Sequence, residues 1–251
     1  MPSLGTLIPP ARRSIRTRLL LLALLPLGIV LPLIMAALAY WGGDYFDQLL
    51  NTKVRSDLAV ANSYYERAAE GVGRSVAGQA AANRVVRAVL TGHGRQTPEL
   101  AAILEETVSA RKLDFLRFID VDSGRRMAAE WPVVAAALAG SERTETEIFT
   151  AAQLAAIAPP LASRAATPLI ATPNAVPTTR SDEERGLVIH SAAPVLDASG
   201  KLLGVLEGGV LLNKNLDFID NLNAVVYPDG TLPLGSAGTA TLFLGDVRVA
   251  T

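Results

Sequence analysis

The strongest hydrophobic pattern in the chain is an uncharged run near its N-terminus. Residues 19–41 read LLLLALLPLGIVLPLIMAALAYW, which is 23 residues without Asp, Glu, Lys or Arg. At about 1.5 Å per residue, a helix of this length crosses a hydrocarbon core of roughly 30 Å. Lipid-embedded helices tolerate internal prolines such as Pro26 and Pro32. The run therefore predicts a transmembrane helix over residues 19–41.

A cleaved signal peptide is the competing interpretation of this run. Ala37, Leu38 and Ala39 form an A-x-A pattern, which is typical of a cleavage site. The apolar region of a signal peptide ordinarily has about 7–15 residues, however, and this run is much longer. We therefore favour a retained anchor, and under either interpretation the residues after it are exported.

The basic residues of the N-terminus orient the predicted helix. The charged residues before position 41 are four arginines, Arg12, Arg13, Arg16 and Arg18. Positively charged flanks stay on the cytoplasmic side of a membrane. Residues 1–18 are therefore predicted to form a cytoplasmic tail at the inner (cytoplasmic) membrane, and residues 42–251 to be periplasmic or extracellular.

A second hydrophobic pattern follows the predicted membrane helix. Apolar residues recur in steps of four and three, which places them on one face of a long helix. They are Phe46, Leu50, Val54, Leu58, Ala61, Tyr65, Ala68, Val72 and Val76. The helix is predicted to reach about residue 90. Its stripe needs a partner, either the sheet of its own domain or the same helix of a second subunit. We expect both, with a homodimer through the membrane-near half.

Beyond residue 90 the hydrophobic period alternates between that of helices and that of strands. Helices are predicted over residues 98–111, 131–140, 151–158 and 215–227. Strands are predicted over residues 113–121, 148–149, 187–196, 202–212, 239–244 and 247–251. Turns are predicted at 122–124 and 197–200, and a proline-rich surface excursion at 159–186. This order predicts an α+β fold in which helices flank an antiparallel sheet.

Charge and cysteine content exclude several classes of protein. Apart from the four N-terminal arginines, the chain carries 19 basic and 24 acidic residues, and this mildly acidic body argues against nucleic-acid binding. There are no cysteines, which excludes disulfides, zinc–thiolate sites and thiol catalysis. The motifs of zinc peptidases, serine hydrolases and nucleotide-binding loops do not occur in the sequence. We therefore predict no catalytic residue, metal or cofactor within this chain.

Two motifs resemble functional ones without matching them. Residues 93–98, HGRQTP, have Thr-Pro at the spacing of a kinase phosphoacceptor helix, but glycines flank His93 and no acidic residue follows it. We interpret His93 as a residue of an inter-helix turn. Asp120 and Asp122 begin like a calcium loop. Glycine falls one place early, however, and Trp131 stands where the bidentate glutamate belongs, so calcium is not predicted there.

The C-terminal part of the chain carries a resemblance to a known family. The segment DASGKLLGVLEGG followed by LLNKN is similar to the end of one Cache unit, and GTATLFLGDVRVAT is similar to the first hairpin of a second. Upstream, DYFDQLLNTKVRSDLAVANSYYER and LDFLRFIDVDSGR match the style of the same family. The chain therefore resembles an N-terminal fragment of the periplasmic double-Cache sensory region of bacterial transmembrane sensor histidine kinases.

The resemblance implies a PAS-like sheet that binds a small ligand and a dimer formed through the long helix. It also implies a second membrane helix that leads to a HAMP linker and a kinase core. Residues 42–227 would be a membrane-distal Cache sensor domain, and residues 228–251 the truncated start of a second Cache unit. We expect residues 228–251 to be poorly ordered or mispacked, because strands of an incomplete unit expose unpaired edges.

Polar residues that interrupt apolar strand faces are the candidate ligand contacts, because ligand pockets are mostly apolar with a few placed polar groups. Arg117 shares a strand face with Phe115 and Ile119. Its guanidinium is suited to clamping a ligand carboxylate. The alternative is a pair with a local acid such as Asp114 or Glu130.

Three further residues, His190, Glu207 and Trp131, complete the predicted ligand-binding site, and Phe149 is considered together with Trp131. His190 lies in an apolar strand, where a structural core histidine is the main alternative to a ligand contact. Glu207 interrupts another apolar strand, and either takes a ligand amine or answers Arg117. Trp131 and Phe149 either cover the pocket or are ordinary core aromatics. The sequence leaves the identity of the ligand open.

These features together predict a ligand-sensing module outside the cytoplasm that belongs to a transmembrane signal-transduction receptor. A two-component sensor histidine kinase is the expected parent. The alternatives are the ectodomain of a chemoreceptor or of a cyclic-dinucleotide signalling enzyme, or a secreted or anchored binding module without signalling output. A ligand would act by its different affinity for two packings of the long helices.

Overall fold

The structure is a computed structural model of the whole chain, and it describes residues 15–170, 178–228, 230 and 238–251. The side chains at positions 17, 39, 41–44 and 46 lie outside this description, as do Arg12 and Arg13. The chain divides into two compact units, Met1–Asp57 and Leu58–Thr251.

Helix α1, Ile15–Ala80, has 66 residues and begins in the first unit. Its apolar segment Arg18–Leu38 has a mean hydropathy of 2.7, and none of it is buried within the structure. Among the described residues, this is the one helix with the length and composition to cross a membrane. Pro26 and Pro32 lie inside the helix. The structure therefore contains the predicted apolar helix, whereas its insertion and orientation in a membrane stay predictions.

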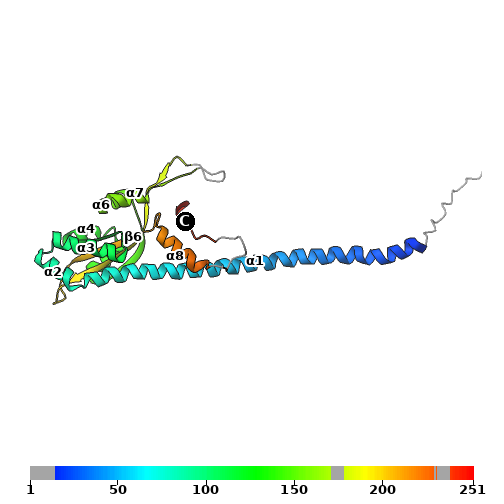
Figure 1. Cartoon of the computed structure of the whole chain (residues 1–251), viewed down its shortest axis with the longest axis horizontal. Coiled ribbons are helices and arrows are strands. Elements are labelled where there is room, and N and C mark those ends of the chain that lie inside the picture. The colour runs from blue at the N-terminus through cyan, green and yellow to red at the C-terminus, as the bar shows by residue number, and fades with distance from the viewer. Residues whose placement is uncertain (1–14, 171–177, 229, 231–237) are drawn as a thin grey trace, which may run out of the picture. The chain divides into compact units, whose positions relative to one another are not determined.

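Four antiparallel strands form the central sheet of the second unit, in the order β1-β6-β5-β2. These strands are β1 Phe115–Asp120, β2 Arg143–Phe149, β5 Gly186–Leu196 and β6 Leu202–Leu211. The β5–β6 hairpin has the predicted turn, and β1 and β2 are the edge strands. Helices flank the sheet (Figure 1), so the predicted α+β class is confirmed.

Seven shorter helices complete the second unit within the described ranges. They are α2 Asn83–Thr91, α3 Pro98–Arg111, α4 Val121–Met127, α5 Pro132–Leu138, α6 Ala151–Ile157, α7 Pro159–Ala165 and α8 Leu216–Val226. Proline stands in the first turn of α3, α5 and α7, where its missing N–H has no helical partner to lose. Thr97 and Thr150 cap α3 and α6. The four helices predicted beyond residue 90 are confirmed.

The two faces of the sheet pack against different helices. On one face, an apolar core joins the end of α1 to α2, α3 and α8, and it includes Val76, Val89, Leu100, Leu206 and Ile219. On the other face, a second core joins α5, α6 and α7, and it includes Val134, Phe149, Leu154, Leu161 and Val205. Strands β1, β5 and β6 supply both cores, because successive side chains of a strand point to opposite faces.

The long helix ends earlier than predicted. It stops at Ala80, and α2 begins at Asn83 after a two-residue break. The break turns the chain so that Val76 of α1 and Val85 of α2 lie in the same core. The apolar period continues through the break because both helices bury their stripes on one sheet, so periodicity alone does not reveal it.

The predicted turn at residues 122–124 is instead part of α4. The carboxylate of Asp120 accepts hydrogen bonds from the backbone N–H groups of Asp122 (3.0 Å) and Ser123 (2.9 Å). An aspartate in this position caps a helix N-terminus. The turn-forming residues of the sequence thus start a helix, and Asp120 has a structural role.

The segment predicted as a surface excursion, residues 159–186, contains regular structure at both ends. Helix α7 begins it, and the short strands β3 Thr167–Pro168 and β4 Asp182–Glu183 pair with each other. Residues 171–177 lie outside the described part. The prolines of this segment predicted a loop because proline usually interrupts a helix. Here proline stands in the first turn of α7, where a helix tolerates it.

The C-terminal residues pack on the second unit. Strands β7 Leu242–Leu244 and β8 Val247–Ala250 pair antiparallel. The buried side chains of this hairpin meet the rest of the unit in a small apolar cluster formed by Leu169, Leu187, Leu242, Leu244, Val247 and Val249. The expectation of a mispacked segment is therefore wrong for residues 242–250, because their apolar side chains find partners within this chain. Residues 229 and 231–237 lie outside the described part.

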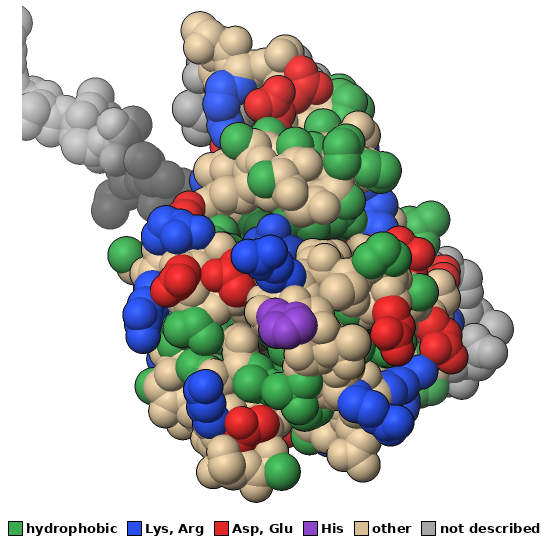
Figure 2. Space-filling model, turned by 90° about the vertical axis from the view of Figure 1, so that its left-hand side faces the viewer, with side chains coloured by type: hydrophobic (Ala, Val, Ile, Leu, Met, Phe, Trp, Pro, Cys, Tyr) green, Lys and Arg blue, Asp and Glu red, His purple; other side chains and the backbone are tan. Residues whose placement is uncertain are grey.

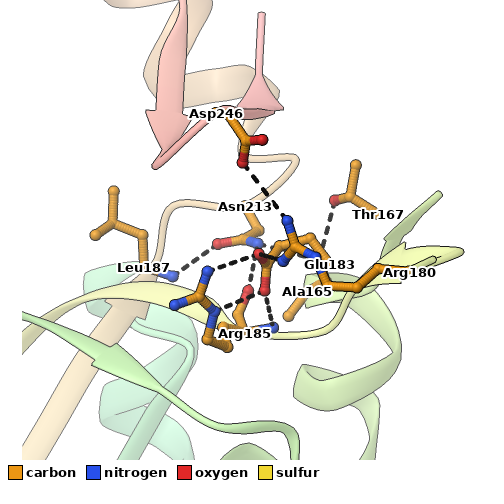
Figure 3. Close-up of polar contacts among 8 residues, drawn as sticks. All are labelled: Ala165, Thr167, Arg180, Glu183, Arg185, Leu187, Asn213 and Asp246. Atoms are coloured by element: carbon orange, nitrogen blue, oxygen red, sulfur yellow. Dashed lines mark hydrogen bonds and ion pairs between the residues drawn. The ribbon is translucent and has the colours of Figure 1, made fainter. Parts of the chain in front are cut away.

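A buried carboxylate lies where β4, β5 and the C-terminal hairpin meet (Figure 3). Glu183 is 2% exposed. Arg185 donates to both of its oxygens at 2.8 and 2.7 Å, and Arg180 donates at 3.1 Å. Arg180 also lies 3.6 Å from Asp246 in the β7–β8 turn. Buried Asn213 donates to the carbonyl oxygen of Arg185 at 3.0 Å. These five residues, the Glu183 cluster, join the hairpin to the sheet.

Candidate functional site

Four ionisable side chains meet on the face of the sheet that α5, α6 and α7 cover. Arg117 comes from β1, Glu207 from β6, His190 from β5 and Glu147 from β2. Arg117 stands directly opposite Glu207, while His190 is a diagonal neighbour of both Glu207 and Glu147. Diagonal neighbours on one face lie within reach of long side chains. The register of the sheet therefore assembles these residues, termed the His190 cluster.

Hydrogen bonds run through the His190 cluster without interruption. Arg117 Nε donates to Glu207 Oε2 at 2.5 Å, and His190 Nε2 lies 2.7 Å from Glu207 Oε1. The other ring nitrogen, His190 Nδ1, is hydrogen-bonded to Glu147. The side chains of His190 and Glu207 are fully buried, whereas those of Arg117 and Glu147 are 29% and 12% exposed. Each ring nitrogen of His190 is therefore hydrogen-bonded to a carboxylate, and the outer members of the cluster, Arg117 and Glu147, reach solvent.

The environment favours a protonated histidine. Burial alone would lower the pKa of His190, but the hydrogen bonds to Glu147 and Glu207 outweigh it and raise the pKa above its ordinary value. Burial would raise the pKa of Glu207, but the hydrogen bonds from His190 and Arg117 and their positive charges lower it. With His190 protonated, two cations face two carboxylates, and the net charge of the cluster is zero.

Aromatic rings surround the imidazole. The ring centroids of Phe149, Trp131 and Phe115 lie 5.0, 5.3 and 6.2 Å from that of His190. The first two rings meet the imidazole nearly at right angles and lie 4.3 Å from each other. Phe149 and Trp131 are buried, so they shield His190 from water, while their contact with a ligand stays a prediction.

The structure brings together all four residues predicted for the site: Arg117, Trp131, His190 and Glu207. Arg117 pairs with Glu207, so the alternatives Asp114 and Glu130 are both wrong. Asp114 pairs instead with Arg164 of α7 at 2.6 Å, and Glu130 is hydrogen-bonded to Gln153 of α6. The pair of Glu207 with Arg117 is one of the two alternatives predicted for Glu207. The acids predicted for Arg117 are its neighbours in sequence, and such neighbours do not reveal a partner on another strand.

Glu147 is the member of the site that the sequence prediction omits. That prediction confines the strand to residues 148–149, whereas β2 begins at Arg143. The alternation in RTETEIF is the signal that could have extended it, because period two places Glu145, Glu147 and Phe149 on one face. Glu147 lies directly opposite Val188 on β5, on the side of the sheet that carries His190.

The geometry suits the binding of a proton or an anion more than the binding of a metal. The carboxylates lie on different ring nitrogens, and no group of three His, Asp or Glu in the described ranges could hold a metal ion. The two Nη atoms of Arg117 have no hydrogen-bond partner among the described residues. Because this side chain is partly exposed, its Nη atoms are available to an anion.

A cleft of about 580 Å³ lies between α1 and β2 on the opposite side of β2. Glu70 of α1 and Thr146 of β2 are among its lining residues. Gly73 and Thr144, which also line it, are in close contact: a Cβ added to Gly73 would lie 2.5 Å from Thr144 Oγ1. Thr144 in turn donates to Ser191 Oγ at 2.9 Å. The two elements therefore touch directly beside the cleft.

At the end of the second unit that carries α2, acidic and basic side chains are interspersed on the surface (Figure 2). A hollow of about 440 Å³ lies among His93, Arg95, Phe118, Asp120 and Asp122. His93 lies in the turn between α2 and α3, as predicted, with a φ of 52°. Asp120 is engaged as the cap of α4. This acid of the rejected calcium motif thus has a structural role.

These features define an α+β domain with a buried, ionisable cluster at the centre of its sheet. No family model and no curated protein matches the chain. Among solved structures, a crystal structure of the periplasmic domain of Vibrio cholerae LuxQ is similar, with 16% identity and a TM-score of 0.39 over 69% of this chain and 70% of that chain. A selenomethionine form of the same domain has 14% identity and a TM-score of 0.41, over 68% of this chain and 69% of that chain. Both likenesses are distant.

Proposed function

We propose that this chain is the extracytoplasmic sensory part of a transmembrane receptor, with α1 as its membrane anchor. The continuity of α1 carries this proposal, because one helix contains the apolar segment Arg18–Leu38 and also ends in the core of the sensory domain. Val72, Val76 and Ala80 are 8%, 0% and 1% exposed. A change in how the sheet packs on these residues would act on the helix that enters the membrane.

Cysteine labelling tests the topology, and the cysteine-free sequence makes single substitutions unambiguous. Ala198 lies in the exposed β5–β6 turn, and Arg16 lies in the exposed first turn of α1. In intact spheroplasts, we expect a membrane-impermeant maleimide to label Ala198→Cys and to spare Arg16→Cys until the membrane is permeabilised. Labelling of Arg16→Cys with protection of Ala198→Cys would contradict the proposal.

A homodimer through the membrane-near half of α1 is part of the same proposal. Leu50, Val54 and Leu58 of the predicted stripe are 48%, 63% and 67% exposed, so they are free to meet a second copy. Val54→Cys is expected to form a disulfide-linked dimer in membranes. Arg55→Cys, one residue away and turned about 100° around the helix, is the matched control. Equal cross-linking of the two variants would argue against a specific interface.

The output of the receptor is proposed to be a histidine kinase, on the strength of the resemblance of residues 194–251 to sensor kinases. Reading the gene beyond codon 251 tests this. A second apolar span followed by a kinase core is the expected result. A methyl-accepting or cyclic-dinucleotide domain would identify another kind of output and leave the sensory role in place.

A further inference from the structure

We propose that the proton is a ligand of this domain, and that its binding to His190 between Glu147 and Glu207 sets the position of β2 against α1. The inference rests on the proposed function, for which it supplies a stimulus. It also stands on geometry that is independent of the membrane: a buried histidine held between carboxylates on two different strands, and an edge strand that touches α1 on its other face.

The cluster needs the proton in order to satisfy its hydrogen bonds. Both ring nitrogens of His190 face carboxylate oxygens, which accept hydrogen bonds and cannot donate them. A protonated imidazole has two N–H groups and serves both carboxylates. A neutral imidazole has one, so loss of the proton leaves the other carboxylate facing a lone pair. Arg117 balances one of the two negative charges, and the second becomes uncompensated beside buried groups.

Glu147 is the carboxylate that gives way when the proton is lost. Glu207 lies on β6, between two neighbouring strands, and is also paired with Arg117. Glu147 lies on the edge strand β2, whose partner among the described strands is β5, and its side chain already reaches solvent. Moving β2 outward takes the uncompensated charge into water. Deprotonation therefore loosens β2 from His190.

The other charged groups around His190 are engaged elsewhere. On β2, Glu145 stands opposite His190 and is paired with Arg143. In the helical layer, α5 and α6 carry no charged residue, and α7 carries Arg164, which is paired with Asp114. The other described charged residues with local partners in that layer are Glu130, bonded to Gln153, Arg126, bonded to Ser123, and Arg125, paired with Asp122. The remaining ring contacts of His190 are aromatic.

The same strand conveys the change to α1. Thr144 of β2 touches α1 at Gly73, where the absence of a Cβ leaves room for the Thr144 hydroxyl against the helix. Thr144 and Glu147 are three residues apart and point to opposite faces of β2. Movement of the strand at Glu147 therefore alters the contact at Gly73. The adjoining cleft, between Glu70 and Thr146, gives β2 room to move.

The pH range of this response is set by the carboxylates. Together they raise the pKa of His190 above its ordinary value of 6.5, so the change is expected at a pH above 6.5. The carboxyl group of Glu207, whose pKa is lowered, stays charged through that range. Over this range, His190 is thus the member of the cluster that binds and releases the proton.

A distance measurement tests the proposal on the full chain in lipid nanodiscs. Spin labels on Glu70→Cys and Thr146→Cys, both exposed on the two sides of the cleft, report the separation of α1 and β2. We expect the distance distribution to shift between pH 5.5 and pH 8.5. The shift should vanish in His190→Gln. It should persist in His93→Asn, because asparagine accepts the left-handed backbone of that residue. An unchanged distribution across this range, or an equal shift in His190→Gln, would overturn the proposal.

A second variant covers the case in which His190→Gln does not fold. Glu147→Gln keeps the size of the side chain and removes one of the two charges that hold the proton. We expect it to move the midpoint of the distance change down by about one pH unit, and an unchanged midpoint would overturn the proposal. The labelling of Ala198→Cys is a separate measurement. A cytoplasmic location of Ala198→Cys would contradict the proposed receptor topology and would not affect the proton site. An α1–β2 distance that does not change with pH would contradict the proton site and would not affect the topology.

Discussion

Among the residues that the structure describes, the domain contains two buried carboxylates, Glu183 and Glu207, whose partners differ in one chemical respect. Glu183 is bound by Arg180 and Arg185, whereas Glu207 is bound by Arg117 and His190. Arginine keeps its proton at any pH that a protein tolerates, but histidine loses it near neutrality. The comparison teaches that the partner, rather than the buried carboxylate, decides whether a cluster is a fixed joint or a responsive one.

The two clusters consequently depend on pH in opposite directions. Hydrogen bonds from Arg185 hold the pKa of Glu183 at about 2. Its stabilisation is therefore present above pH 4.5 and is lost as the pH falls toward 2. The pKa of His190 is raised. Its stabilisation is present in full below pH 6.5 and is lost as the pH rises through the higher, folded-state value.

Removal of Glu183 is expected to have the largest effect. Glu183→Ala leaves Arg180 and Arg185 without their carboxylate and loosens the C-terminal hairpin. We expect a loss of about 3 kcal/mol in the free energy of unfolding, measured by urea titration at pH 7. This lies at the low end for a broken buried pair, because both arginines are partly exposed.

The neighbour of Glu183, Glu184, supplies the control. Glu184→Ala removes an exposed carboxylate and is expected to change the free energy by less than about 0.5 kcal/mol. Equal losses in Glu183→Ala and Glu184→Ala would mean that burial of the first carboxylate does not matter. The Glu183 cluster would then not be the fixed joint that the comparison with the His190 cluster requires.

The alkaline side of the stability profile tests the His190 cluster. The free energy of unfolding is expected to fall as the pH rises above 6.5, by at most about 1.4 kcal/mol per pH unit for one proton. In His190→Gln this slope should flatten, and in His93→Asn it should remain. Thermal unfolding followed by circular dichroism between pH 5.5 and 9 measures it. A slope retained in His190→Gln would assign the titration to another group.

The two clusters also differ in how far the sequence predicts them. Arg117, His190 and Glu207 interrupt apolar strands, and period two identifies them as residues of a buried face. Glu183 follows an unpatterned, proline-rich stretch, so no period marks it as buried. Glu183 is buried because β4 packs near the hairpin that follows α8, and this tertiary contact is not visible in the local sequence.

Elements fixed by local chemistry are the ones that the sequence predicts well. The hairpin over Asp197 and Gly200 has local turn chemistry and strong alternation, and β5 and β6 form where predicted. The break after Ala80 and the start of α4 at Val121 depend instead on packing and on a single cap. Glu147 is an intermediate case. The alternation in RTETEIF predicts which residues share a face of the strand, but both faces carry polar residues, so the pattern does not show which face is buried.

The smallest expected effect concerns the arginines of the two clusters. Arg185 donates to Glu183 through Nε and Nη2, whereas Arg117 uses Nε alone toward Glu207. The predicted anion contact of Arg117 depends on its remaining Nη donors. Arg117→Lys keeps the charge and the ion pair, so we expect a change in stability below about 1 kcal/mol. It removes the planar fork, so any thermal stabilisation by small mono- or dicarboxylates at pH 6.5 should be lost, as in Arg117→Ala. Stabilisation that persists undiminished in both variants would place the anion elsewhere and leave Arg117 as the charge partner of Glu207.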